Sequence, residues 1–243
     1  MYKNYIFDLY GTLVDINTNE YKNYLWEKMV EIYGFEGANY TTRELKKSYF
    51  EQVEIEKESV KKLHPEFTNI DIQIEKVFEN LLKIKGIEPP DKFGEYSSKM
   101  FRAISTKYIK LYDGVIELLQ LLKNNNKKVY LLTNAQRGFT APEIKMLGIE
   151  NYFDGIIISS DEYTCKPDKS FYNVLFKRYG VKPEESIMIG NDCHSDIMGA
   201  YGVGMDSLYI HTNISPEVDI ELKSNFNIMD GDFKKIKDLI IMQ

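Results

Sequence analysis

The chain has 243 residues, 43% of them hydrophobic and 13% aromatic, which is enough for a sizeable core and excludes wholesale disorder. Its formal net charge of −6 argues against a general nucleic-acid or anionic-membrane binder, because such proteins need a basic surface. No stretch approaches the roughly 20 apolar residues of a membrane span, and an acid at position 8 precedes any signal-peptide core. We therefore expect a cytoplasmic protein with neither nucleic-acid nor membrane partners.

The first element in the chain is a short apolar run, residues 5–7, that leads directly into Asp8. A buried parallel strand has this pattern, and Gly11 with Thr12 then turns the chain. The carboxyl ends of strands are where open α/β sheets bind their ligands. Asp8 is therefore the first candidate for a functional residue.

Residues 17–110 are rich in Lys, Glu and Tyr and carry apolar residues at helical spacing. Gly34, Pro65 and the pair Pro89 and Pro90 interrupt this pattern. The segment therefore predicts about four helices that form a small helical module.

From residue 112 onward, apolar runs alternate with helical patterns. With the strand before Asp8, the runs predict five buried strands, a pattern typical of a doubly wound parallel sheet in an α/β protein. The domains are then a core of residues 1–15 and 112–243 and a helical cap of residues 16–111 inserted into it. The expected later strands are 129–133, 156–159, 187–190 and 207–210, and the expected helices include 115–123, 170–179 and 196–201.

Polar residues follow several of these predicted strands. Because parallel strands end at one edge of the sheet, Asp8, Thr133, Ser159, Lys166 and the turn at Gly190 are expected to meet in one crevice. A helical module inserted just after Asp15 would lie over that crevice as a cap.

Four segments occur in a characteristic order. They are Asp8-x-Tyr10-Gly-Thr12, Thr133-Asn134, Lys166-Pro-Asp, and Gly190-Asn191-Asp192-x-x-x-Asp196. Together they resemble the motifs of the haloacid dehalogenase (HAD) superfamily, whose members have a Rossmann-like core with an inserted helical cap.

The resemblance implies roles for several residues. Asp8 would be the nucleophile and form a covalent intermediate that water hydrolyses. Lys166 would supply a compensating cation, while Thr133 and Asn134, together with Thr12, would bind substrate oxygens.

The fourth segment is the predicted metal site, since its carboxylate and amide oxygens suit Mg²⁺. In metal-dependent members, the nucleophile and the backbone carbonyl two residues later also bind the metal; here these are Asp8 and Tyr10. The family's remaining metal-binding acid can be aligned with two positions of this chain. Counting forward from Gly190 places it at Asn191, and counting back from Asp196 places it at Asp192. We favour Asp192 for its charge, with Asp196 orienting its neighbours. These acids could instead cap the following helix.

The tyrosine at position 10 leaves two enzymatic functions to be compared, phosphatase and dehalogenase. Phosphatases of this superfamily place an acid–base aspartate there, and an unperturbed phenol, with a pKa near ~10, is a poor substitute. L-2-haloacid dehalogenases carry this tyrosine, need no Mg²⁺ and use a cap arginine, for which Arg43 is the candidate. Asp192 without a cation would repel Asp8, which favours the phosphatase. We therefore expect Mg²⁺-dependent hydrolysis of a small phosphate monoester, with dehalogenation or a non-catalytic binding module as alternatives.

Two further residues lie inside the fourth segment. Cys193 is, with Cys165, one of only two cysteines, and both are expected to be free thiols. His194 beside it is expected to be a partly exposed loop residue without a catalytic role.

Overall fold

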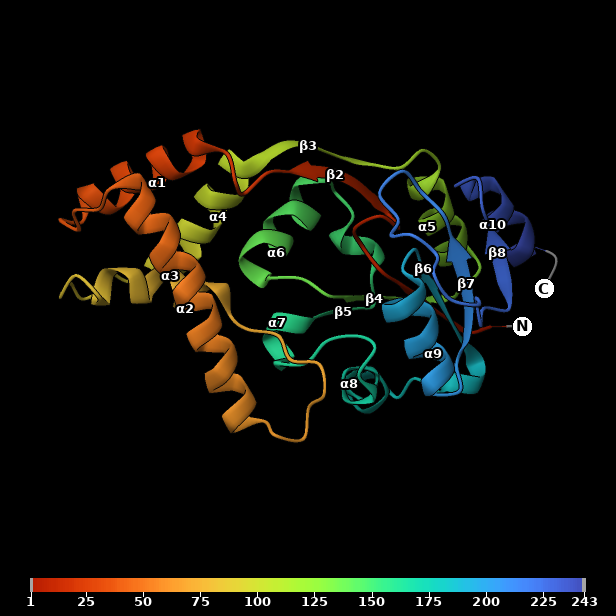
Figure 1. The fold of residues 1–243 in the computed structure, drawn as a ribbon. Coiled ribbons are helices and arrows are strands. Elements are labelled where there is room, and N and C mark those ends of the chain that lie inside the picture. The colour runs from red at the N-terminus through yellow and green to blue at the C-terminus, as the bar shows by residue number, and fades with distance from the viewer. Residues whose placement is uncertain (1, 242–243) are drawn as a thin grey trace.

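The computed structural model describes residues 2–241, and its centre is a six-stranded parallel sheet in the order β5-β4-β1-β6-β7-β8 (Figure 1). The α/β class predicted from the sequence is confirmed. The sheet has one strand more than expected, because β8 is only three residues long and leaves no clear apolar run. The strands are β1 (Asn4–Phe7), β4 (Lys128–Thr133), β5 (Gly155–Ile158), β6 (Ser186–Gly190), β7 (Asp206–Ile210) and β8 (Phe226–Ile228).

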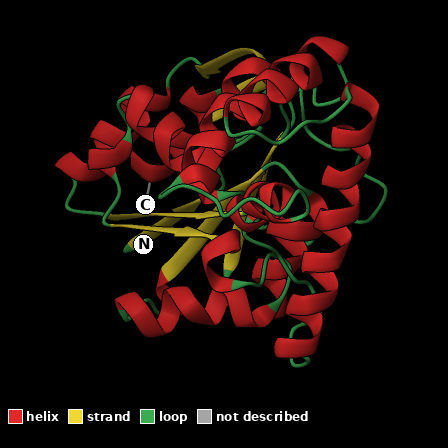
Figure 2. Cartoon of the chain, turned by 90° about the vertical axis from the view of Figure 1, so that its left-hand side faces the viewer, coloured by secondary structure: helices red, strands yellow, loops and turns green. Residues whose placement is uncertain are grey.

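Helices cover both faces of this sheet, as Figure 2 shows. Alternate residues of β1 point to opposite faces, so Tyr5 and Phe7 join one apolar cluster while Ile6 joins another. The first cluster includes residues of α5 and α10, and the second includes residues of α8 and α9. The core helices are α5 (Val115–Asn124), α6 (Arg137–Met146), α7 (Ser159–Glu162), α8 (Lys169–Tyr179), α9 (Met198–Gly202) and α10 (Phe233–Ile241).

The helical insert contains α1 (Asn23–Phe35), α2 (Thr42–Leu63), α3 (Ile74–Lys83) and α4 (Phe93–Ser105), the four helices expected. The insert has its own apolar cluster, in which the single tryptophan, Trp26, is buried against Tyr49 and Phe101. Thr41 begins α2 with a capping box: its hydroxyl accepts from the Glu44 N–H, and the Glu44 side chain accepts from the Thr41 N–H. Within residues 2–241 no helix combines the length and apolarity needed to cross a membrane.

A two-stranded antiparallel ribbon joins the insert to the core, and the sequence did not predict it. It pairs β2 (Val14–Thr18) with β3 (Thr106–Leu111), which lie about 90 residues apart in the chain. This pairing is tertiary, and β3 is mostly exposed, so neither strand carries a strong apolar pattern. The predicted boundaries at 15/16 and 111/112 lie within this ribbon and at its end, and they remain a prediction.

The segment after β6 begins differently from the expected helix at 196–201. A single π-helical turn, η3 (Cys193–Ile197), comes first, and α9 follows it. Asp192 is the N-cap: its Oδ1 accepts from the backbone N–H groups of His194 at 2.8 Å and Ser195 at 3.1 Å. Short 3₁₀ turns, η1 (Glu150–Tyr152) and η2 (Pro183–Glu185), precede β5 and β6.

Candidate active site at the carboxyl edge of the sheet

Asp8 directly follows the central strand β1. Its backbone N–H donates to Ile189 O of β6 at 3.0 Å, so the residue is fixed between two parallel strands. The next turn strongly favours glycine at position 11, where φ is +82° and a Cβ would lie 2.2 Å from Asn191 Nδ2. The close packing of Gly11 against Asn191 brings the first and fourth predicted motifs together.

Lys166 connects two buried carboxylates. Its Nζ donates to Asp8 Oδ1 at 2.7 Å and to Asp196 Oδ1 at 2.6 Å, and its side chain is only 1% exposed. Asn134 holds this lysine in place, since its Oδ1 accepts from the Lys166 N–H at 2.8 Å and its Nδ2 donates to the Lys166 carbonyl at 2.9 Å. The side chain of Asn134 therefore positions Lys166, a contact that the sequence did not predict.

These contacts change the acidity of the buried groups. Burial favours the neutral amine of Lys166, but the two carboxylates outweigh it and raise the pKa of Lys166. Burial raises the pKa of Asp196 to about 7; Lys166 opposes this effect and Asp8 adds to it. The second oxygen of Asp196 accepts from the Asp192 N–H at 3.0 Å. Asp196 is therefore committed to Lys166 and to the backbone of the fourth motif, rather than pointing freely into the crevice.

Two threonines lie beside Asp8 but have different surroundings. The Thr12 hydroxyl donates to Asn191 Oδ1 at 3.1 Å and lies 3.4 Å from Asp8 Oδ2. The Thr133 hydroxyl, at the end of β4, is buried and has no hydrogen-bond partner among the described residues. An unpaired buried hydroxyl is costly, and a ligand oxygen bound beside Asp8 would satisfy it.

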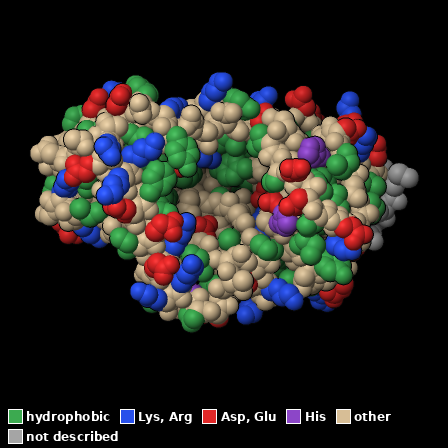
Figure 3. Space-filling view, in the orientation of Figure 1, with side chains coloured by type: hydrophobic (Ala, Val, Ile, Leu, Met, Phe, Trp, Pro, Cys, Tyr) green, Lys and Arg blue, Asp and Glu red, His purple; other side chains and the backbone are tan. Residues whose placement is uncertain are grey.

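A cavity of about 270 Å³ opens at this edge of the sheet. Figure 3 shows the molecule hollowed between the helical insert and the core. Thr133 and Asn134 lie in the cavity wall together with the first and fourth motifs, so the structure brings those three predicted motifs to one place. The cavity is lined by Asp8, Tyr10, Thr133, Asn134, Asn191, Asp192, Ser195, Asp196, Ile214 and Pro216.

The two competing residues of the fourth motif are engaged in different ways. The Asn191 amide accepts from Thr12 and donates to Ser215 Oγ at 3.3 Å, so both its ends are used. Asp192 uses Oδ1 to cap η3, while its other oxygen remains for a further ligand. Lys166 is shared between Asp8 and Asp196, whereas Asp192 has no cationic partner among the described residues. A dication with oxygen preference therefore fits this donor set.

The Tyr10 hydroxyl is engaged in hydrogen bonds with other side chains and is therefore not available as an acid or base at Asp8. It donates to Glu143 Oε2 and lies 2.9 Å from Thr140 Oγ1, both on α6. Arg102 of α4 stacks over the Tyr10 ring, with its guanidinium carbon 5.4 Å from the ring centroid, and its Nε donates to Glu143 Oε1 at 2.6 Å. Burial and then the Glu143 charge raise the pKa of Tyr10.

Glu143 and Arg102 were not singled out in the sequence. Arg102 comes from the helical insert and Glu143 from the core, so their pairing is visible only in three dimensions. One signal was available: Glu143 is an acid within an otherwise apolar or small helical stretch, residues 138–144. The predicted cap arginine, Arg43, is instead exposed on the first turn of α2 and does not line the cavity.

Comparison with known proteins identifies the family to which the chain belongs. The family model described as haloacid dehalogenase-like hydrolase matches residues 2–204. Glyceraldehyde 3-phosphate phosphatase of Pyrococcus furiosus is 27% identical over 60% of the chain, and the match spans only 61% of that enzyme. N-acylneuraminate-9-phosphatase of Mus musculus is 26% identical over 82% of this chain and 78% of its own length.

Solved structures support the same fold. A 2-haloacid dehalogenase from Pseudomonas syringae superimposes with a TM-score of 0.69 at 16% identity, covering 100% of this chain and 99% of its own. A Bacillus subtilis HAD hydrolase, in a crystal form bound to magnesium, gives a TM-score of 0.57 at 20% identity, covering 98% of each chain. Since the family model covers most of the sequence, the chain belongs to the haloacid dehalogenase-like hydrolases.

Proposed function

We propose that the chain is a Mg²⁺-dependent phosphatase that hydrolyses a small phosphate monoester, with Asp8 as the nucleophile. The observation that carries the proposal is the pairing of a buried lysine with Asp8 next to the unpaired Thr133 hydroxyl. This arrangement offers a nucleophile, a cation and a hydrogen-bond donor to an anionic, oxygen-rich group. The curated relatives named above are phosphatases, which supports the same reaction class.

The metal would be held by oxygen atoms of Asp8, the Tyr10 carbonyl and the fourth motif. Bound there, Mg²⁺ would neutralise charge on the substrate and on the nucleophile. Of the two candidates in the fourth motif, Asp192 supplies a negative charge, while Asn191 is linked to Asp8 through the Thr12 hydroxyl. Asp196 would act indirectly, because both its oxygens already accept hydrogen bonds from Lys166 and the Asp192 backbone.

The chain's own groups would perform two displacements. A carboxylate oxygen of Asp8 attacks phosphorus, the phosphorus–oxygen bond to the alcohol breaks, and an aspartyl phosphate forms. Water then releases phosphate and restores the Asp8 carboxylate. Lys166 and Thr133 would bind the phosphoryl oxygens. Because the Tyr10 hydroxyl is bonded to Glu143, the departing alkoxide would take its proton from water, which favours substrates with good leaving groups.

Dehalogenation is the second candidate, and Tyr10 is the observation that favours it. A halide leaves without a proton, so a phenol tied to Glu143 would not hinder the reaction. Asp8 would then attack carbon, and water would hydrolyse the resulting ester. Against this candidate, no arginine lines the cavity among residues 2–241, and Arg102 is already paired with Glu143. The cavity therefore lacks the guanidinium expected near a halide.

The deciding experiment is hydrolysis of p-nitrophenyl phosphate with Mg²⁺ and with EDTA, using Asp8→Asn as the blank. This leaving group needs little protonation, so Tyr10 cannot mask activity. We expect Mg²⁺-dependent turnover that is abolished in Asp8→Asn. Turnover in neither condition, together with halide release from a 2-haloacid, would replace the phosphatase with the dehalogenase. Absence of both activities and of Mg²⁺ binding would support a non-catalytic module.

Two variants would then separate the competing metal ligands. Asp192→Asn keeps an N-capping side chain on η3 but removes the charge, whereas Asn191→Ala removes the amide next to Thr12. If Asp192 binds the metal, Asp192→Asn raises the Mg²⁺ concentration needed for half-maximal activity more than Asn191→Ala does. The reverse order would assign the metal to Asn191.

A further inference from the structure

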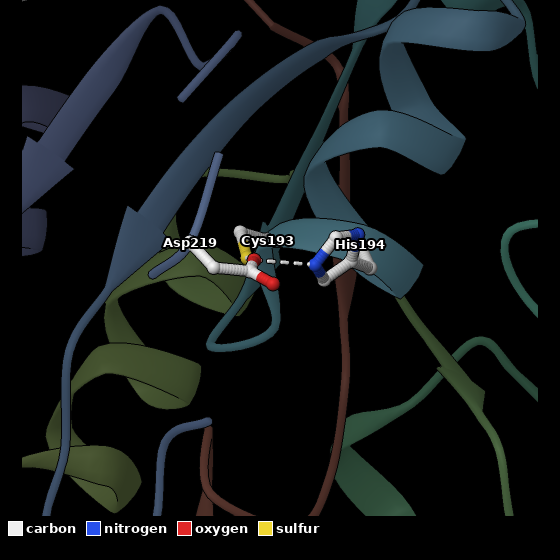
Figure 4. Close-up of side chains that lie close together, drawn as sticks. All are labelled: Cys193, His194 and Asp219. Atoms are coloured by element: carbon white, nitrogen blue, oxygen red, sulfur yellow. Dashed lines mark hydrogen bonds and ion pairs between the residues drawn. The ribbon is translucent and has the colours of Figure 1, made fainter. Parts of the chain in front are cut away.

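A second cluster of metal-ligating side chains lies beside the cavity, outside the proposed Mg²⁺ site. It consists of Cys193 and His194, at the start of η3, and Asp219, from the segment between β7 and β8 (Figure 4). One ligand atom from each residue lies within 4.8 Å of the other two. His194 Nε2 is 2.6 Å from Asp219 Oδ1, and Cys193 Sγ is 4.0 Å from the same oxygen.

We infer that Cys193, His194 and Asp219 form a binding site for Zn²⁺, distinct from the Mg²⁺ site. A thiolate, an imidazole and a carboxylate are the ligands that Zn²⁺ takes, whereas Mg²⁺ is rarely bound by sulfur or nitrogen. Thiolate and carboxylate together balance the charge of the dication. Binding breaks the Cys193 S–H bond, forms the sulfur–zinc bond and releases the proton to solvent.

The present geometry needs little change to accept the ion. Tetrahedral Zn²⁺, with bonds of about 2.0 Å to oxygen and nitrogen and about 2.3 Å to sulfur, places its ligand atoms roughly 3.3–3.5 Å apart. His194 Nε2 and Asp219 Oδ1 must therefore separate by somewhat less than an ångström, and Cys193 Sγ must approach Asp219 Oδ1 by about half an ångström. The ligand atoms of Cys193 and His194 already lie within 4.8 Å of each other. The side chains of His194 and Asp219 are 54% and 63% exposed, so they are free to move and leave room for a water as fourth ligand.

The backbone already holds two of the three ligands. Asp192 Oδ1 accepts from the His194 N–H, which fixes the first turn of η3. The Cys193 side chain is buried, and its thiol has only weak contacts, 3.9 Å to the Glu217 carbonyl and 4.0 Å to Asp219. Zn²⁺ would join this turn to the segment that carries Ile214 and Pro216, two residues of the cavity wall.

The test measures Zn²⁺ binding to the full, metal-free chain by competition with a chromophoric chelator, and uses Co²⁺ as a spectroscopic probe. We expect one equivalent of Zn²⁺ to bind and the Co²⁺ form to show a near-ultraviolet thiolate-to-cobalt band. Co²⁺ at the oxygen-rich Mg²⁺ site gives no such band, so the outcome is independent of the proposed function. Asp219→Asn and His194→Asn, both at exposed positions, should each weaken binding about ten-fold or more.

Matched controls use the other cysteine and another histidine paired with an acid. Cys193→Ser should abolish the cobalt band, whereas Cys165→Ser and His64→Asn should leave the band and the Zn²⁺ affinity unchanged. A cobalt band that survives Cys193→Ser, Zn²⁺ affinity unaltered by Asp219→Asn, or absence of the band in the unmodified chain would overturn the inference. Circular dichroism of Cys193→Ser checks that the loss of the band does not reflect unfolding.

Discussion

A buried ion pair crosses the junction between the helical insert and the core, and its removal gives a sharp prediction. In the Arg102–Glu143 pair, the side chains are only 14% and 9% exposed. Arg102→Met keeps much of the apolar stem but leaves the Glu143 carboxylate buried, with the Tyr10 hydroxyl as its main remaining partner. Breaking one side of a buried pair costs about 3–5 kcal/mol. For a chain of this length the melting temperature should fall by roughly 6–20 °C.

The assay is urea denaturation followed by two signals. Fluorescence of Trp26 reports the helical insert, and far-ultraviolet circular dichroism reports the whole chain. Coincident curves allow a single free energy of unfolding to be assigned. Separate curves would mean that the insert unfolds on its own. The loss of stability caused by Arg102→Met should then appear mainly in the Trp26 signal.

The control is an ion pair on the same helix α4, Lys99 with Glu95, whose side chains are 40% and 48% exposed. Lys99→Ala should cost less than about 1 kcal/mol, because solvent screens exposed pairs. The double variant Arg102→Met/Glu143→Met should recover most of the loss, since no buried charge is left unpaired. If Arg102→Met were no more harmful than Lys99→Ala, the buried pair would not be what stabilises this junction.

Three shorter predictions follow from the same structure. Lys166→Gln should lower the activity of the proposed phosphatase by about 10²-fold or more in steady-state assays, because the cation beside Asp8 is lost; unchanged kcat would refute its role. Gly11→Ala should destabilise the chain by at least about 1–2 kcal/mol in urea, since φ is +82°, whereas helical Gly34→Ala, with open space around it, should be neutral or stabilising. Burial and the nearby acids raise the pKa of Cys165 to about 12, so its alkylation by iodoacetamide should keep accelerating as pH rises beyond 9; a plateau near pH 9 would contradict this environment.

Much of the fold could be predicted because local patterns decide it. Apolar runs ending in polar residues located β1, β4, β5, β6 and β7, and helical periodicity located the four helices of the insert. The β2–β3 ribbon and β8 escaped prediction because their strands are short or exposed, and because pairing partners distant in the chain leave no local pattern.

The candidate site could likewise be predicted only in part. Residue order and the strand ends predicted that Asp8, Thr133, Ser159, Lys166 and the turn at Gly190 would meet in one crevice. The structure places Asp8, Thr133 and the fourth motif around one cavity and bonds Lys166 to Asp8. Ser159 does not line the cavity, because its hydroxyl is bonded to Asp71 and to the Ala135 N–H. The burial of Asp196, its sharing of Lys166 with Asp8, and the bonds of Asn134 to the Lys166 backbone were not predictable. Such contacts depend on how four segments that are distant in the chain, those of Asp8, Asn134, Lys166 and Asp196, pack together.

The sequence alone determined the alternation of strands and helices, the insertion of a helical module and the order of the motif residues, since each of these is written in local spacing and residue type. Only the tertiary structure decided the partners of side chains from distant segments. In the folded chain the Tyr10 hydroxyl donates to Glu143, and Arg102 lies over the Tyr10 ring and donates to the same carboxylate. The Thr133 hydroxyl has no partner among the described residues, and Arg43 is exposed. The physical reason is that hydrogen bonds and ion pairs act over a few ångströms. Residues 130 positions apart, such as Tyr10 and Thr140, come within that distance only when the chain has folded.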